Sequence, residues 1–181
     1  MAGTVPVLIR STEENQAELT AMEDCHVGVG AVLARFRHGV ECEVEAGKLY
    51  DEGELSDKLV SFRMALSDIQ DLSFDTISAA GANGALCHYN HLNGDPAKLT
   101  LNNLYLVDSG GQYLDGTTDV TRTVTIGEPS AEHRKMFTLV LKGHIALATA
   151  TFPKGTGGMQ LDVLARQFLL GEGYDSDHGT R

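Results

Sequence analysis

Two aspartates, Asp108 and Asp119, lie in the part of this sequence best suited to chemistry, the run YLVDSGGQYLDGTTDVTRTVTIG from Tyr105 to Gly127. Both sit among residues that are otherwise apolar or threonine, a pattern that predicts neighbouring strands of one antiparallel ribbon. A carboxylate in a half-buried sheet costs free energy unless something neutralises its charge. An arginine or lysine, backbone donors or a metal ion could each do this, and the choice among them decides the function.

The loop between the two strands decides whether a metal ion can reach both aspartates. A tight turn at Asp115-Gly116 would leave Asp108 and Asp119 on one face but offset by about 13 Å along the strand. Carboxylate–metal distances of about 2.0–2.6 Å do not allow one ion to span that offset. We therefore expect a wide loop over 110–117, with the two aspartates nearly opposite each other.

Aspartate is also common in turns, because its side chain accepts hydrogen bonds from nearby backbone N–H groups. This explanation suits Asp115, which precedes Gly116. It suits Asp119 less well, since that residue lies inside the strand-like run TTDVTRT. On spacing alone, the turn interpretation and the metal-ligand interpretation of Asp108 and Asp119 both stay open.

Two of the seven histidines are candidates for the same site. His88 ends the apolar run LCHY in a predicted strand at 85–89, and His178 lies in an HGT sequence. Two carboxylates and two imidazoles could form a hydrolytic metal site, in which the imidazoles bind substrate or stabilise an oxyanion. His133 and His144 fall on a predicted helix and are interpreted as ordinary surface or core residues.

Helices precede and follow the strands that must position these residues. Apolar residues at steps of three or four, together with capping residues and terminal glycines, predict four helices. They are expected at about 13–37, capped at 11–14 and ending before Gly39, then at 51–67, capped at 51–54, and at 131–151 and 159–170. Strands are expected at 74–80, 85–89, 104–109 and 119–126. Helices, antiparallel strands and helices in that order define an α+β fold.

Composition excludes several classes of function. The chain has 181 residues, 42% of them hydrophobic, which is enough for a domain with a real core and argues against disorder. A net charge of −11 disfavours nucleic acid and anionic membranes as partners. No signal peptide is evident, and no apolar run approaches the roughly 18 residues of a membrane span. Three cysteines, Cys25, Cys42 and Cys87, predict reduced thiols in a cytoplasmic protein.

Four blocks resemble the catalytic domain of aminopeptidase P (Xaa-Pro aminopeptidase), in the pita-bread metallopeptidase family. They are DLSFDTISAAGANGALCHY, YLVDSGGQYLDGTTDVTRTVTIGEPS, FTLVLKGHIALATATFPKGT and HGT, of which DGTTDVTRT is close to a signature. The resemblance covers nearly the whole chain from about Ser11. It implies a pita-bread fold, with 1–181 as a single partial catalytic domain: the first half at about 11–128 and helices of the second half at about 130–171.

The resemblance also implies roles for the candidate residues. Asp108 and Asp119 match the family's first two metal ligands, and His88 and His178 match its substrate-binding histidines. The cofactor implied is a divalent metal pair, with manganese typical and cobalt or zinc as alternatives. A hydroxide activated by two metals would hydrolyse the bond between an N-terminal residue and a following proline. The expected partners are peptides with proline in the second position.

The sequence departs from the family pattern in ways that matter for activity. The HGxGHG block reads HGTR and stops at Arg181, before the histidine that is a further metal ligand, and two later glutamates and the N-terminal domains are absent. His26-Val-Gly-Val also stands where His-Ile-Arg-Asp is common. With two of five protein ligands, the chain is expected to be an inactive fragment. Uncovered apolar faces of the helices at 131–151 and 159–170 predict a homo-oligomer or a swapped arrangement.

Two other functions stay open. The chain could belong to another pita-bread hydrolase, such as a proline dipeptidase, methionine aminopeptidase or creatinase, although DGTTDVTRT and GHIALATATFP favour aminopeptidase P. It could also be a non-catalytic binding module that keeps the fold and has lost the metals. The presence of both aspartates and both histidines argues against that second alternative.

Overall fold

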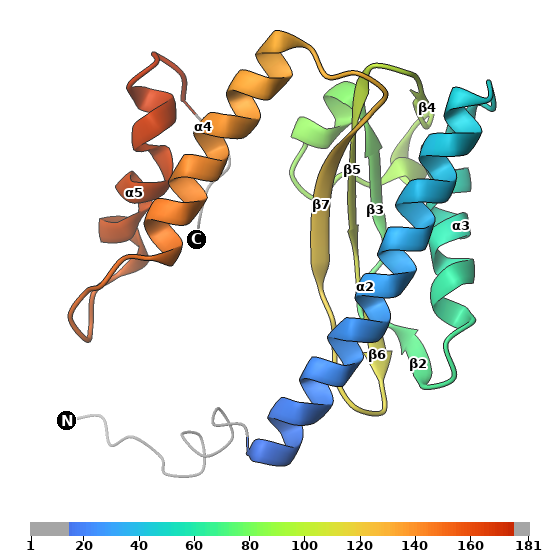
Figure 1. The fold of residues 1–181 in the computed structure, drawn as a ribbon, viewed down its shortest axis with the longest axis horizontal. Helices are drawn as coiled ribbons and strands as arrows, with labels where there is room; N and C mark the ends of the chain where they lie inside the picture. The colour runs from blue at the N-terminus through green and yellow to red at the C-terminus, as the bar shows by residue number, and fades with distance from the viewer. Residues whose placement is uncertain (1–14, 176–181) are drawn as a thin grey trace. The chain divides into compact units, whose positions relative to one another are not determined.

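The computed structural model describes residues 15–175, which divide after Gly127 into two compact units. The first unit contains all of the strands in the described range, and the second contains two helices (Figure 1). Asp108, Asp119 and His88 belong to the first unit. His178 lies outside the described residues. That 1–181 forms a single partial catalytic domain stays a prediction.

The first helix in the described range, α2 (Gln16–Glu45), is capped by Asn15. The Asn15 side chain accepts hydrogen bonds from the N–H groups of Ala17 and Glu18, at 2.9 and 3.1 Å. The Glu18 carboxylate accepts one from the Asn15 N–H at 2.7 Å. These bonds satisfy donors that the start of a helix leaves unpaired. The capping box expected at 11–14 lies outside the described residues.

The expectation that this helix ends before Gly39 is wrong, because α2 continues to Glu45. Val40 and Val44 extend its buried stripe and are only 1% and 3% exposed. Burying a valine side chain contributes about 1.5–3 kcal/mol. A glycine inside a helix costs only about 1 kcal/mol. Packing against the rest of the unit therefore outweighs the local helix-ending signal.

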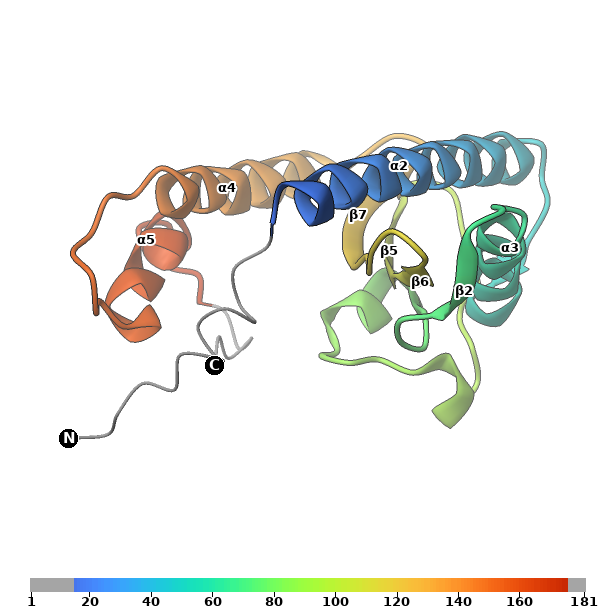
Figure 2. The ribbon, with the colours of Figure 1, turned by 90° about the horizontal axis from the view of Figure 1, so that it is seen from below.

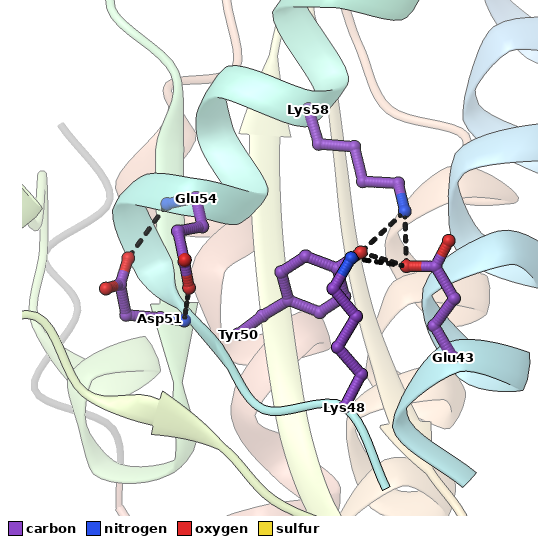
Figure 3. Close-up of polar contacts among 6 residues, drawn as sticks. All are labelled: Glu43, Lys48, Tyr50, Asp51, Glu54 and Lys58. Atoms are coloured by element: carbon purple, nitrogen blue, oxygen red, sulfur yellow. Dashed lines mark hydrogen bonds and ion pairs between the residues drawn. The ribbon is translucent and has the colours of Figure 1, made fainter. Parts of the chain in front are cut away.

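The second helix, α3 (Glu52–Met64), begins where the sequence predicts. The Asp51 carboxylate accepts a hydrogen bond from the Glu54 N–H, and the Glu54 carboxylate accepts one from the Asp51 N–H, both at 2.8 Å (Figure 3). This is the predicted capping box. The helix ends at Met64 rather than near residue 67.

The strands in the described range all pair antiparallel, as the α+β prediction requires. The main sheet has three strands in the order β3-β5-β7 (Figure 1). In addition, β1 with β4 and β2 with β6 form two-stranded ribbons. Two short 3-10 helices, η1 and η2, lie between β3 and β4. The bounds are β1 (Tyr50–Asp51), β2 (Ile69–Leu72), β3 (Ile77–Ala80), η1 (Gly81–Ala85), η2 (His91–Asn93), β4 (Lys98–Leu99), β5 (Asn103–Ser109), β6 (Gly111–Tyr113) and β7 (Val120–Ile126).

The core of the first unit lies between the two helices and one face of the main sheet (Figure 2). The Phe36 ring of α2 is 6.4 Å from both the Phe62 ring of α3 and the Tyr105 ring of β5. Tyr105, Val107 and Ser109 of β5 are buried, and the residues between them are half-buried. Because side chains of a strand alternate between its faces, Asp108 lies on the sheet face away from the helices.

A polar cluster joins the end of α2 to β1 and α3 (Figure 3). The Tyr50 hydroxyl donates a hydrogen bond to the Glu43 carboxylate, and the Lys58 ammonium donates to the same carboxylate at 2.6 Å. The Lys48 and Lys58 ammonium groups lie 4.3 and 4.9 Å from the centre of the Tyr50 ring. The hydrogen bonds from Lys58 and Tyr50 lower the pKa of Glu43 to about 2.

The second unit consists of α4 (Ala131–Ala148) and α5 (Gly158–Leu170), which pack on each other. They cross so closely at Gly143 that a Cβ there would lie 2.0 Å from the Ala165 carbonyl oxygen. Several apolar side chains of these helices are exposed, among them Phe137, Val140, Ile145, Met159 and Val163. A homo-oligomer formed through them stays a prediction. Among the helices of residues 15–175, none is both long and apolar enough to cross a membrane.

Candidate metal centre

The ribbon of β5 and β7 brings the two aspartates together. Asp108 of β5 pairs with Thr121 of β7, and Asp119 lies two residues before Thr121. Residues two apart on a strand share a face, so Asp119 is a diagonal neighbour of Asp108 on the same face. The two carboxyl groups lie close enough for the negative charge of Asp119 to act on Asp108.

The expectation of a wide loop over 110–117 is wrong. The Tyr113 N–H donates a hydrogen bond to the Gly116 carbonyl oxygen at 2.8 Å, which closes a tight turn. The turn is centred one residue earlier than the tight turn considered from the sequence, so Gln112 faces Thr117. Moving a turn by one residue changes every cross-strand partner by two residues. The offset between the aspartates therefore falls from four residues to two, and a wide loop is not needed.

Gly110 allows the ribbon to bend beside the aspartates, where the ladder between β5 and β7 ends. A Cβ at this position would lie 1.9 Å from the Thr118 carbonyl oxygen and 2.2 Å from Ser73 Oγ. Ser73 also donates its N–H to the Gly110 carbonyl oxygen at 3.3 Å and its hydroxyl to the Thr118 carbonyl oxygen at 2.9 Å. Only glycine permits so close an approach, which directs the chain into β6 and its pairing with β2.

The electrostatic environment of Asp108 favours a bound cation. Burial and then the negative charge of Asp119 raise the Asp108 pKa, although the Thr121 hydrogen bond and the His88 charge act in the opposite direction. The Oδ1 atom of Asp108 is buried without a hydrogen-bond partner. A bound divalent ion would relieve the repulsion and satisfy this oxygen, so the carboxylate pair fits a metal.

His88 lies in a turn, so the strand predicted at 85–89 is wrong. The Tyr89 N–H donates to the Leu86 carbonyl oxygen at 3.2 Å, and His88 takes the third position of this turn with φ 53°. Glycine or asparagine is preferred at such a position. The left-handed conformation costs other residues about 1–2 kcal/mol. Strained backbone of this kind clusters at functional sites.

The turn lies on the same sheet face as the aspartates. It follows η1, where a Cβ on Gly84 would be 3.4 Å from the Cβ of Leu106, two residues before Asp108 on β5. The charge of His88 acts on Asp108, which places the imidazole within electrostatic reach of that carboxylate. Residues 15–175 contain no group of three or more His, Cys, Asp or Glu side chains arranged to hold a metal ion.

Arg63 of α3 supports the site from the core side, and the sequence patterns did not single it out. Its side chain is fully buried and donates to Ser109 Oγ and the Ser109 carbonyl oxygen, both at 3.0 Å, and to the Tyr113 hydroxyl at 3.1 Å. The Ser109 hydroxyl also shares a 3.1 Å hydrogen bond with the Thr76 hydroxyl. These bonds hold the residue that follows Asp108. Arginine is normally exposed, so nothing in the sequence marks Arg63 as a buried residue.

Comparison with known proteins identifies the class to which this fold and site belong. The sequence model of the metallopeptidase family M24 matches residues 20–181, and the chain belongs to that family. It is 49% identical over 168 residues to the probable Xaa-Pro aminopeptidase P of Sordaria macrospora, covering 92% of this chain and 27% of that protein. The corresponding protein of Aspergillus flavus is 50% identical over 168 residues, covering 92% and 26%. The chain thus spans about a quarter of the length of these curated relatives.

Solved structures agree with this assignment. The X-prolyl aminopeptidase of Caenorhabditis elegans, described as a cytosolic enzyme with a di-nuclear active site, superposes with a TM-score of 0.87 and 44% identity over 98% of this chain and 29% of that one. The prolidase of Thermococcus sibiricus superposes with a TM-score of 0.70 and 28% identity over 89% and 41%. The resemblance to aminopeptidase P and the α+β pita-bread fold are confirmed.

Proposed function

We propose that this chain supplies part of the two-metal site of an Xaa-Pro aminopeptidase, which hydrolyses the bond between an N-terminal residue and a following proline. The observation that carries the proposal is the pair Asp108 and Asp119, two carboxylates on one face with a buried oxygen that lacks a partner. The names of the relatives and the di-nuclear active site of the Caenorhabditis elegans enzyme support it.

In this proposal each candidate residue has a separate task. Asp108 and Asp119 hold divalent ions, for which oxygen ligands favour manganese, with cobalt or zinc as alternatives. When bound, such ions polarise a carbonyl and generate a nucleophile at neutral pH. His88 binds and orients the peptide whose second residue is proline, together with His178, which lies outside the described residues.

The 181-residue chain by itself is expected to bind metal weakly and to lack activity. Affinity for a divalent ion rises with the number of charged protein ligands, so two carboxylates hold one weakly. We infer that this chain alone does not hydrolyse Xaa-Pro peptides, and that its exposed apolar helices associate as a homo-oligomer. We also propose a cytoplasmic location, which the description of the Caenorhabditis elegans enzyme as cytosolic supports.

Manganese binding tests the site directly. We expect calorimetry to give a Kd on the order of 10⁻⁴–10⁻³ M for the native chain. Asp108→Asn and Asp119→Asn should each abolish that binding, whereas Asp57→Asn, at an exposed position of α3, should leave it unchanged. Equal manganese affinity in all four proteins would show that the aspartate pair is not the site. Manganese-dependent release of alanine from Ala-Pro-Ala would separately refute the inactivity of the chain.

A non-catalytic peptide-binding module is the second candidate. The observation that favours it is the lack of a three-ligand metal cluster among residues 15–175. Such a module would bind Ala-Pro-Ala equally well with and without manganese. The proposed enzyme site would bind the peptide more tightly when the metal is present.

A further inference from the structure

Glu52, the first residue of α3, is a buried carboxylate that gathers four hydrogen bonds. Its side chain is fully buried, and its Oε1 accepts from the Ala80 N–H at 2.7 Å and from Asn83 Nδ2 at 2.9 Å. Its Oε2 accepts from the Tyr89 hydroxyl at 2.6 Å and from the Ala97 N–H at 2.9 Å. Burial alone would raise the Glu52 pKa, but these donors outweigh it and lower the pKa, so the group is a charged acceptor.

The four donors lie along one connecting segment of the chain, from the end of β3 to the start of β4. Ala80 and Ala97 hold its two ends, and Asn83 and Tyr89 hold its middle. The Asn83 amide also donates to the Tyr89 hydroxyl at 3.0 Å, so Tyr89 is fixed from two sides. Burial and the negative charge of Glu52 raise the Tyr89 pKa to about 12, so its hydroxyl keeps its proton at neutral pH.

The residue before Tyr89 is His88, whose backbone has φ 53°. A strained left-handed residue persists only where its surroundings determine the conformation more strongly than its own preference does. Two backbone hydrogen bonds involve the turn that contains His88, from the Tyr89 N–H to the Leu86 carbonyl oxygen at 3.2 Å and from the Leu86 N–H to the Asn83 carbonyl oxygen at 3.1 Å. The His88 side chain is exposed, so packing does not hold it. A tertiary constraint on the turn is the neighbouring Tyr89 side chain, anchored on Glu52.

We propose that Glu52, acting through Tyr89, is a positioning residue that holds the His88 turn in its left-handed conformation and so presents the imidazole toward Asp108. The use of this geometry for peptide binding rests on the function proposed above. The positioning itself does not, because it concerns the conformation of one turn. A carboxylate at the start of α3 thereby sets the geometry of a residue thirty-six positions later in the chain.

Backbone NMR on the 181-residue chain tests the positioning. In the native protein, the His88 amide should have an order parameter of about 0.85, and its one-bond Cα–Hα coupling should show positive φ. Tyr89→Phe removes one donor and leaves Glu52 three others. We expect the order parameter of His88 to fall below about 0.6 in this variant and the positive-φ coupling to disappear. Glu52→Gln should have the same effect. If Glu52→Gln fails to fold, the result for Tyr89→Phe tests the positioning on its own.

Tyr50→Phe is the matched control. It also removes a phenol hydrogen bond to a carboxylate, that of Glu43, but in the cluster that joins α2 to α3 (Figure 3). His88 should stay rigid in this protein. The inference is overturned if His88 keeps its order parameter and coupling in Tyr89→Phe, or if Tyr50→Phe loosens it equally, since the effect would then be general destabilisation.

Peptide binding separates this inference from the proposed function. If the competent turn falls to about a tenth of the molecules, the apparent Kd for Ala-Pro-Ala should rise about tenfold in Tyr89→Phe. A His88→Ala variant should weaken peptide binding at least as much. If His88→Ala binds the peptide normally while Tyr89→Phe still loosens the turn, the proposed role of His88 in binding fails and the positioning by Glu52 stands.

Discussion

Gly110→Ala is the substitution whose outcome depends most directly on the bend beside the aspartates. The added Cβ would lie 1.9 Å from the Thr118 carbonyl oxygen and 2.2 Å from Ser73 Oγ. The first of these atoms belongs to the backbone, so side-chain rotation cannot relieve the contact. The two chain segments must separate by more than 1 Å to reach an ordinary van der Waals distance.

The expected loss of stability has two parts. Overpacking of a tight site costs about 1–3 kcal/mol. Separation of the segments also lengthens the hydrogen bonds from Ser73 to Gly110 and Thr118, now 3.3 and 2.9 Å, each of which contributes about 1 kcal/mol. We therefore expect Gly110→Ala to lower the free energy of unfolding by about 3–5 kcal/mol, a large share of the 5–15 kcal/mol of a typical domain.

Urea unfolding followed by far-ultraviolet circular dichroism measures this loss, with two glycines as controls. Gly30 lies in the exposed part of α2 with nothing within 4 Å of a Cβ, so Gly30→Ala should raise the free energy of unfolding by about 1 kcal/mol. At Gly111 the three atoms nearest to a Cβ all belong to the Tyr113 side chain, the closest at 2.8 Å, and a side chain can move more easily than backbone. Gly111→Ala should therefore cost less than Gly110→Ala.

The test compares the free energies of unfolding of the three variants, of which Gly110→Ala should be the least stable. If Gly110→Ala unfolds within 1 kcal/mol of the native protein, the close approach at this bend is not present in solution. The explanation of how the ribbon bends beside Asp108 and Asp119 would then fail as well.

Two further predictions concern His88 and the cluster around Glu43. His88→Gly should be more stable than His88→Ala by about 1 kcal/mol, because glycine adopts positive φ without strain; equal midpoints in urea would contradict the strain. The Glu43 pKa is lowered from 4.5 to about 2, chiefly by the hydrogen bonds from Lys58 and Tyr50, so its stabilisation is complete above pH 4.5 and lost as the pH falls toward 2. The melting temperature of the native protein should therefore exceed that of Glu43→Gln at neutral pH and approach it near pH 2, whereas a difference that is constant with pH would exclude this linkage.

Local signals in the sequence were sufficient for several features. The capping box of Asp51 and Glu54 involves residues three apart, and the structure has it as predicted. The bounds of β5, which carries Asp108, and of β7, which ends before Gly127, also agree with the predicted bounds to within one residue. The reason is that the β-branched and apolar residues of these strands lie in contiguous runs. Four sequence blocks, of which DGTTDVTRT is close to a signature, indicated the family to which the chain belongs.

Other features depend on residues that are distant in sequence. Gly39 ends a helix by local preference, but burial of Val40 and Val44 carries α2 past it. LCHY has the composition of a strand, yet Tyr89 is anchored on Glu52, thirty-seven positions earlier, and the segment forms a turn.

The sequence by itself determined which residues could do chemistry here: the carboxylates of Asp108 and Asp119 and the imidazole of His88. Tertiary structure decided how they meet. The position of the turn after β6 sets the offset between the aspartates, and the close contact of Gly110 with Ser73 and Thr118 permits the bend. The physical reason is that propensity acts over a few neighbouring residues. Burial, close backbone approach and hydrogen bonds to buried charges depend on partners that only folding brings together.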